Sequence, residues 1–293
     1  MPNINKVPAG AGAEWLLGGF ALLRKAPVGL GLLGLGWGLL SLFALFSAGV
    51  NPTLGMLLQL AVALLGPFLF AGLLWAVREV DQGRQALPEH LFQGLRSGQS
   101  LALLATLLPQ LVTGLVLGVL LLVLVGPDHL QKVLDVSLEL QAVAEAGGQP
   151  DPAMLSALPV GRLFLWMLIL LAAVPVVVFF IFLSVPQILF SGRPGLEALG
   201  TSFRASLRNL PAMLVFILMT FVAFFAIAFV VQLLALVVQL IAGPAFGLMV
   251  GQLALMAVLM PVLAGAVYRA WQQVLVSPDA KPVEQVSPAQ IEV

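Results

Sequence analysis

The chain has 293 residues, of which 61% are hydrophobic and only 9% are charged. Soluble domains carry roughly a quarter charged residues, so a water-soluble core cannot hide this much apolar surface and the main solvent must be lipid. The formal net charge of zero argues against a nucleic-acid partner, and the absence of cysteine excludes disulfides, thiolate chemistry and cysteine-based metal sites.

Six long apolar runs follow one another along the chain. Because about 20 residues of helix cross about 30 Å of hydrocarbon, each run predicts one transmembrane span. The predicted spans are residues 28–48, 54–77, 101–125, 163–190, 210–242 and 247–268. Short breaks at Asn51-Pro52 and Gly243-Pro244 indicate tight hairpins. We therefore predict an all-α fold, a polytopic membrane helical bundle whose six transmembrane helices form three hairpins.

Glycine pairs four residues apart occur in two of the odd-numbered spans, at Gly34 and Gly38 and at Gly114 and Gly118. This spacing lets another helix backbone approach closely in a membrane. We expect close helix contacts at both pairs.

A short amphipathic segment precedes each hairpin. The clearest runs from Leu196 to Pro211, and its apolar positions share one helix face: Leu196, Leu199, Phe203 and Leu207. Similar segments lie at 14–25 and around Pro88. We predict short cytoplasmic interfacial helices with their apolar faces in the lipid headgroup region. The alternative is that these helices pack under neighbouring protein, with their arginines simply solvated.

Basic side chains on these three segments are the candidate contacts with lipid headgroups or with a partner protein, because guanidinium and ammonium groups pair with lipid phosphates. They are Arg24, Lys25, Arg96, Arg204 and Arg208.

The three segments align with one another, which predicts a three-fold internal repeat. Glu14, Glu89 and Glu197 are each followed two residues later by leucine. The even-numbered spans also match, since each carries a proline, then a glycine, then an arginine. The prolines are Pro67, Pro186 and Pro261, and the arginines are Arg78, Arg193 and Arg269. We interpret the three prolines as helix kinks, either gating hinges or static bends.

The distribution of basic residues predicts the orientation. Eleven of the 13 Lys and Arg residues lie in the N-terminal segment, the 78–100 loop, the 191–209 loop and the C-terminal segment, whereas only Lys132 and Arg162 lie on the opposite side. The positive-inside rule then places both termini in the cytoplasm and the 126–162 loop outside. We predict a disordered lead at 1–12, a membrane domain at 13–271 and a disordered cytoplasmic tail at 272–293.

Reactive groups are scarce in the spans. None carries an ionisable residue away from its ends, which weakens a proton- or sodium-coupled transporter and rules out intramembrane aspartyl catalysis. The predicted topology puts His90 and His129 on opposite sides, which leaves no histidine metal site. We therefore expect no cofactor, no metal and no enzymatic activity.

Glutamines are the polar feature of the spans. Gln110, Gln187 and Gln252 would line a polar cavity for a neutral solute in a transporter. Buried glutamine more often makes hydrogen bonds between helices.

Several of these features together resemble a known family. The Trp15–Pro27 lead, the Pro67/Gly72/Arg78 ending and the stretch LEALGTSFRASLRNLPAML resemble uncharacterised bacterial six-helix inner-membrane proteins. That family is similar to the membrane domain fused to some glycerophosphodiester phosphodiesterases. The resemblance covers about residues 13–271. It implies a bacterial inner-membrane location and an all-helical fold, and it carries no catalytic residues.

Three functional hypotheses remain open. The first is a non-catalytic membrane component that binds lipid or a partner membrane protein, as a subunit of a complex or as a homo-oligomer. The second is a transporter or channel for a small neutral or amphipathic solute. The third is an intramembrane enzyme.

Overall fold

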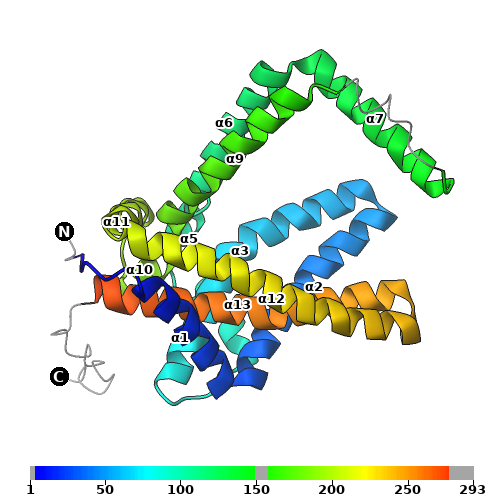
Figure 1. The fold of residues 1–293 in the computed structure, drawn as a ribbon. Coiled ribbons are helices and arrows are strands. Elements are labelled where there is room, and N and C mark those ends of the chain that lie inside the picture. The colour runs from blue at the N-terminus through cyan, green and yellow to red at the C-terminus, as the bar shows by residue number, and fades with distance from the viewer. Residues whose placement is uncertain (1–3, 149–157, 277–293) are drawn as a thin grey trace, which may run out of the picture. The chain divides into compact units, whose positions relative to one another are not determined.

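The computed structural model describes residues 4–148 and 158–276. Within these ranges every regular element is a helix (Figure 1). Six helical segments are long and apolar enough to cross a membrane. They are α2 (Pro27–Val50), α3 (Pro52–Asp81), α5 and α6 (Ser100–Ala105 and Leu108–Val125), α9 and α10 (Val160–Ile181 and Ser184–Ser191), α12 (Leu210–Ala242) and α13 (Pro244–Leu275). The prediction of an all-α, six-span membrane protein is confirmed.

The shorter helices lie between or before these spans. They are α1 (Ala11–Lys25), the 3-10 helix η1 (Pro88–Phe92), α4 (Gln93–Arg96), α7 (Pro127–Glu145) and α11 (Gly195–Arg208). The chain divides into two compact units, one comprising residues 1–106 and 180–293 and the other Leu107–Phe179. We describe each unit by itself.

Local chemistry explains where the hairpins turn. The Asn51 side chain accepts a hydrogen bond from the backbone N–H of Leu54 at 3.1 Å, which caps the start of α3. Pro52 and Pro244 occupy the first positions of α3 and α13, where a missing N–H costs nothing. Gly243 before α13 has a φ of 90°, which glycine adopts readily.

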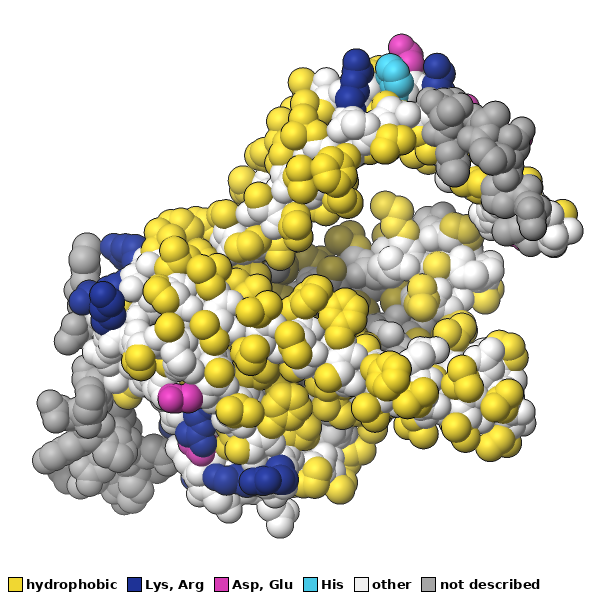
Figure 2. Space-filling model, in the orientation of Figure 1, with side chains coloured by type: hydrophobic (Ala, Val, Ile, Leu, Met, Phe, Trp, Pro, Cys, Tyr) yellow, Lys and Arg dark blue, Asp and Glu magenta, His cyan; other side chains and the backbone are white. Residues whose placement is uncertain are grey.

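The long helices expose large apolar side chains that water would not tolerate over such an area. On α12, Leu218, Phe221 and Phe229 are each more than half exposed. Figure 2 shows hydrophobic side chains spread widely over the visible surface. This exposure agrees with helices that are long and apolar enough to cross a membrane.

Helix α1 is a core element of the first unit. It packs against both α12 and α13, and Trp15 and Leu22 are almost completely buried. Glycines make this possible: a Cβ on Gly12 would lie 2.1 Å from the Ala212 carbonyl oxygen, and one on Gly19 would lie 2.2 Å from that of Val262. Helix α1 is therefore packed under neighbouring protein, which is the second of the two arrangements that the sequence left open.

The other two short segments pack against the hairpin that precedes them in the sequence. Helices η1 and α4 contact α3, and α11 contacts α5 and α10. The approach is again close, because a Cβ on Gly94 would lie 2.4 Å from the Phe68 carbonyl oxygen. Since α1 packs on the last hairpin, the three short helices contact the three hairpins in a cyclic order.

Both chain ends of the membrane domain are more ordered than the sequence predicted. The Asn5 N–H donates to the Val274 carbonyl at 2.9 Å, and the Val7 N–H donates to Asn209 Oδ1 at 2.9 Å. Helix α13 continues to Leu275. The prediction of disorder is wrong for residues 4–12 and 272–276, because the lead finds hydrogen-bond partners on α13 and at the end of α11. Residues 1–3 and 277–293 lie outside the described residues.

The three predicted kink prolines differ in their surroundings. Pro67 and Pro261 lie inside the continuous helices α3 and α13, and a kink at either stays a prediction. Pro186 follows a helix break at Phe182–Leu183, because proline has no N–H to donate to the carbonyl four residues earlier. The Ser202 hydroxyl of α11 accepts a hydrogen bond from the Leu183 N–H at 2.9 Å, which stabilises the break.

The second unit is built on α6 and α9, which lie side by side (Figure 1), with the Trp166 indole N–H donating to the Leu117 carbonyl at 2.9 Å. A Cβ on Gly114 or Gly118 would meet nothing within 4 Å, so the predicted close contact at this pair is wrong within the described residues. In the first unit, by contrast, a Cβ on Gly34 would lie 2.4 Å from the Met256 carbonyl oxygen, and the predicted close approach is confirmed.

The packing of α1 yields a stability prediction. Gly19→Ala places a methyl group against the α13 backbone, and we expect overpacking of this kind to cost about 1–3 kcal/mol. Thermal unfolding of the full chain in detergent measures the loss. Gly200→Ala on α11 is the control, because its Cβ would meet nothing within 4 Å. Equal melting temperatures for the two variants would contradict the contact.

Candidate functional site

Three arginines mark the ends of the even-numbered spans. Arg78, Arg193 and Arg269 are each the first charged residue after a long uncharged run. All three belong to the first unit. The three arginines occupy equivalent positions in the predicted repeat, but the structure shows that their environments differ.

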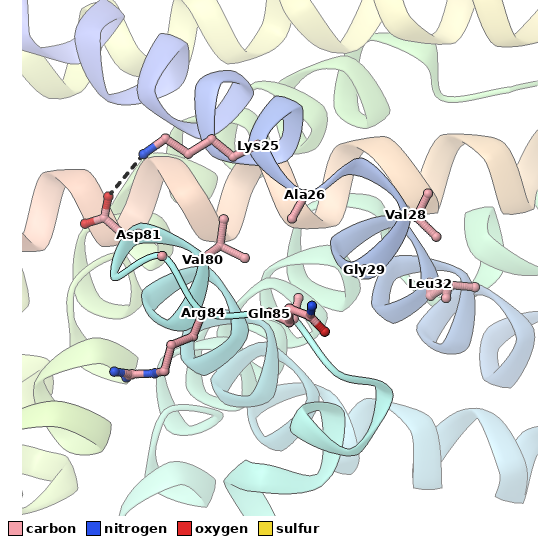
Figure 3. A pocket seen from close by; sticks show the side chains of 11 residues that line it. Lys25, Ala26, Val28, Gly29, Leu32, Val80, Asp81, Arg84 and Gln85 are labelled. Carbon is pink, nitrogen blue, oxygen red and sulfur yellow. Dashed lines mark ion pairs between the residues drawn. The ribbon is translucent and has the colours of Figure 1, made fainter.

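Arg269 forms a two-pronged pair with Asp81. Its guanidinium nitrogens lie 2.6 and 3.2 Å from the two carboxylate oxygens, a geometry that gives strong charge-assisted hydrogen bonds. The Lys25 ammonium lies 4.0 Å from the same carboxylate, as Figure 3 shows. Asp81 thus joins α1, α3 and α13, and two cations share its charge.

The other acids near these arginines are also paired. Arg193 forms an ion pair with Glu197 one helical turn later. Arg84 donates to both carboxylate oxygens of Glu79, and this hydrogen bonding raises the pKa of the Arg84 guanidinium above its ordinary value.

Arg78 differs from the other two arginines because its neighbours are aromatic. Its guanidinium carbon lies 5.6 Å from the ring centre of Trp75 and 5.1 Å from that of Phe190, within the range of cation–π attraction. Among the described residues, no carboxylate oxygen lies within 4.0 Å of its nitrogens. The side chain is half-buried.

The rings around Arg78 come from all three even-numbered spans. Phe190 of α10 lies 5.1 Å from Trp271 and 6.0 Å from Tyr268, both of α13, and 6.4 Å from Trp75 of α3. We call Trp75, Phe190, Tyr268 and Trp271 the aromatic cluster. Sequence reasoning missed it, because the four residues come from three spans that are far apart in the chain.

Helix α11 presents three different faces. Most of its buried residues are small or polar, including Ala198, Ser202 and Ala205. Leu196 and Leu207 are exposed, and the Arg204 and Arg208 side chains are exposed beside them. Of the four residues of the predicted apolar face, Leu196 and Leu207 therefore point away from the protein.

Two members of the predicted apolar face do contact protein. Leu199 is buried, and Phe203 stacks on Phe180 with ring centres 4.4 Å apart. The small-residue face packs inward because the N–H of Leu183 and the carbonyl of Ala198 take part in hydrogen bonds with side chains of the facing helix. A leucine face would leave such groups unpaired.

All five predicted contact residues have exposed side chains. They lie on three different elements: Arg24 and Lys25 on α1, Arg96 on α4, and Arg204 and Arg208 on α11. Lys25 alone among them has an ion-pair partner within the described residues. Figure 2 shows Lys and Arg side chains in small separate groups amid hydrophobic surface.

The three candidate glutamines lie in different environments. Gln187 is buried, and its amide nitrogen donates to the carbonyls of Leu183 at 3.1 Å and of Ala198 at 3.5 Å. It therefore links α10 to α11, as the helix cross-linking interpretation requires. Gln252 is half-buried in α13, and Gln110 is exposed in α6 of the second unit. A polar cavity shared by the three stays a prediction.

An open pocket of about 680 Å³ lies beside the Lys25–Asp81 pair (Figure 3). Its walls come from the junction of α1 and α2 and from the end of α3, with Lys25, Asp81 and Arg84 as its charged residues. Within residues 4–148 and 158–276, no group of three or more His, Asp or Glu side chains is placed to hold a metal ion.

The six apolar spans define the chain as a multi-pass integral membrane protein. Comparison with protein-family models, with curated proteins and with solved structures finds no match.

The Asp81 pair yields a second stability prediction. Asp81→Asn leaves the half-buried Arg269 without its carboxylate, and we expect a loss of about 1.5–3 kcal/mol, as for other hydrogen bonds to charged groups. Thermal unfolding in detergent measures this loss. The control is Glu197→Gln, which breaks an exposed i,i+4 pair and should cost about 0.5 kcal/mol or less. A larger effect for the control would show that Asp81 does not tie the helices.

Proposed function

We propose that this chain is a non-catalytic integral protein of the bacterial inner membrane that binds anionic lipid at its cytoplasmic surface. The observation that carries the proposal is the surface of α11, where exposed Leu196 and Leu207 lie beside exposed Arg204 and Arg208. A helix in the plane of the interface needs such a pairing of apolar and basic faces.

Exposure of the apolar edge of α11 to water would be unfavourable. Leu196 is 70% exposed, and burying a leucine side chain is worth about 1.5–3 kcal/mol. Insertion of this edge of α11 into the headgroup region recovers that energy. Each arginine near an anionic surface adds about 1 kcal/mol. The small inner face anchors α11 to α10, so the lipid-facing edge is held in place.

The bacterial inner-membrane location and the cytoplasmic termini belong to the same proposal. They are supported by the family resemblance and by the excess of Lys and Arg in the segments that precede and follow the hairpins. A three-fold internal repeat is also part of it. The cyclic order in which α1, η1 with α4, and α11 contact the hairpins supports that origin.

The same exposed edge of α11 would also bind a partner membrane protein, in place of lipid. Native mass spectrometry of the chain extracted in membrane nanodiscs separates the two forms of the proposal. A defined heteromeric complex favours the partner, and a lone chain or homo-oligomer that retains anionic phospholipid favours the lipid.

Charge reversal on α11 tests lipid binding. We expect the double variant Arg204→Glu, Arg208→Glu to retain much less phosphatidylglycerol than the wild type, because two favourable interactions of about 1 kcal/mol each become repulsive. The readout is the ratio of phosphatidylglycerol to phosphatidylcholine around the chain in mixed nanodiscs. Lys132→Glu, in the loop predicted to lie outside, is the matched control. An unchanged ratio in the double variant would rule out the lipid form of the proposal.

Single-cysteine labelling tests the orientation, and the absence of native cysteine makes the background clean. Gln85 and Gln131 are both exposed and lie in segments predicted to face opposite sides. We expect a membrane-impermeant maleimide to label Gln131→Cys in intact cells and Gln85→Cys only after permeabilisation. The reverse pattern would place the termini outside.

A further inference from the structure

We propose that Arg78, held against Trp75 and Phe190, binds the phosphate group of an anionic phospholipid where the even-numbered spans end. The inference rests on the proposed lipid-binding function and deepens it, because it assigns one specific headgroup site in addition to the broad surface of α11.

The charge balance around Arg78 is the first argument. The two carboxylates near the end of α3 are both engaged: Asp81 pairs with Arg269 and Lys25, and Glu79 pairs with Arg84. Arg78 has no carboxylate within 4.0 Å among the described residues. Arg78 therefore has no direct ion-pair partner in this part of the chain.

The other two arginines at the ends of the even-numbered spans differ from Arg78 in this respect. Arg193 and Arg269 occupy the corresponding ends of the even-numbered spans, and both have carboxylate partners. Of these three arginines, Arg78 alone is left to pair with an anion from elsewhere.

The geometry of the side chain is the second argument. The two rings restrain the position of the Arg78 guanidinium. An aromatic ring attracts the cation without supplying an oxygen acceptor, so the N–H donors of the guanidinium remain available for an anion. A fixed guanidinium fork matches two oxygens of a phosphate. A lysine ammonium would offer a point charge without this directionality.

The depth of the site is the third argument, and it favours lipid over free phosphate. Arg78 follows directly on the uncharged stretch Pro52–Val77, so it stands where the hydrocarbon region gives way to the headgroups. Trp75 lies against Arg78, Trp271 lies against Phe190, and both tryptophans are half-buried. Such rings gather at that level of the membrane. The exposed parts of these rings offer an apolar wall to the glycerol and upper acyl chain of a bound lipid.

Native mass spectrometry of the full, delipidated chain in detergent tests the site, with phosphatidylglycerol as the probe. We expect Arg78→Gln to weaken binding of the tightest phosphatidylglycerol by about ten-fold or more, the loss typical of a charge-assisted hydrogen bond. Arg78→Lys should fall between wild type and Arg78→Gln, because it keeps the charge and loses the fork. Arg193→Gln is the matched control and should bind as the wild type does.

Circular dichroism and melting temperature show whether each variant keeps its fold. A purely structural role for Arg78 would lower the melting temperature and leave phosphatidylglycerol affinity unchanged in the folded fraction, and that result would overturn the inference. Displacement of the bound lipid by millimolar inorganic phosphate would also overturn it, because the site would then hold a free anion.

The α11 variants keep this test separate from that of the proposed function. If Arg204→Glu, Arg208→Glu loses lipid and Arg78→Gln does not, the specific site is wrong and the proposed function stands. If Arg78→Gln loses one lipid and the α11 variant loses none, the specific site stands and the role of α11 is wrong.

Discussion

The first unit depends on the close approach of helix backbones at small residues. Gly19 of α1 and Gly265 of α13 face each other so closely that a Cβ on Gly265 would lie 2.7 Å from the Gly19 Cα. In lipid, apolar side chains gain little by leaving one apolar solvent for another, so helices associate through van der Waals contact and hydrogen bonds. Glycine permits both by removing the side chain that would hold the backbones apart.

This constraint explains why a short helix can be a core element of a membrane protein. Helix α1 has Gly12 against α12 and Gly19 against α13, and its Trp15 indole donates to the Gln273 side chain at 2.7 Å. The same end of α13 accepts hydrogen bonds from Asn5. The lead and α1 together therefore hold the last hairpin, while η1 with α4 and α11 contact the hairpins before them.

Charge is organised by a different rule, since the spans carry it only at their ends. Few carboxylates form the ion pairs there: Asp81 pairs with both Arg269 and Lys25, and Glu197 pairs with Arg193. The exposed arginines of α11 and the ring-bound Arg78 remain without carboxylate partners among the described residues. Lipid phosphate supplies the missing charge in the function that we propose, and the two kinds of site differ in how firmly the side chain is held.

The sequence by itself determined the fold class, the six spans, the turns at Asn51 and Gly243 and the helical nature of 196–208, because composition, run length and periodicity act locally. It also found the arginines that end the even-numbered spans. Only the tertiary structure decided which glycine pairs are used, since Gly34 and Gly114 have the same spacing but different neighbours. It likewise decided that Asn5 is ordered by residues more than 200 positions away. The contrast between paired Arg269 and unpaired Arg78 depends on long-range contacts, and no local pattern in the chain encodes it.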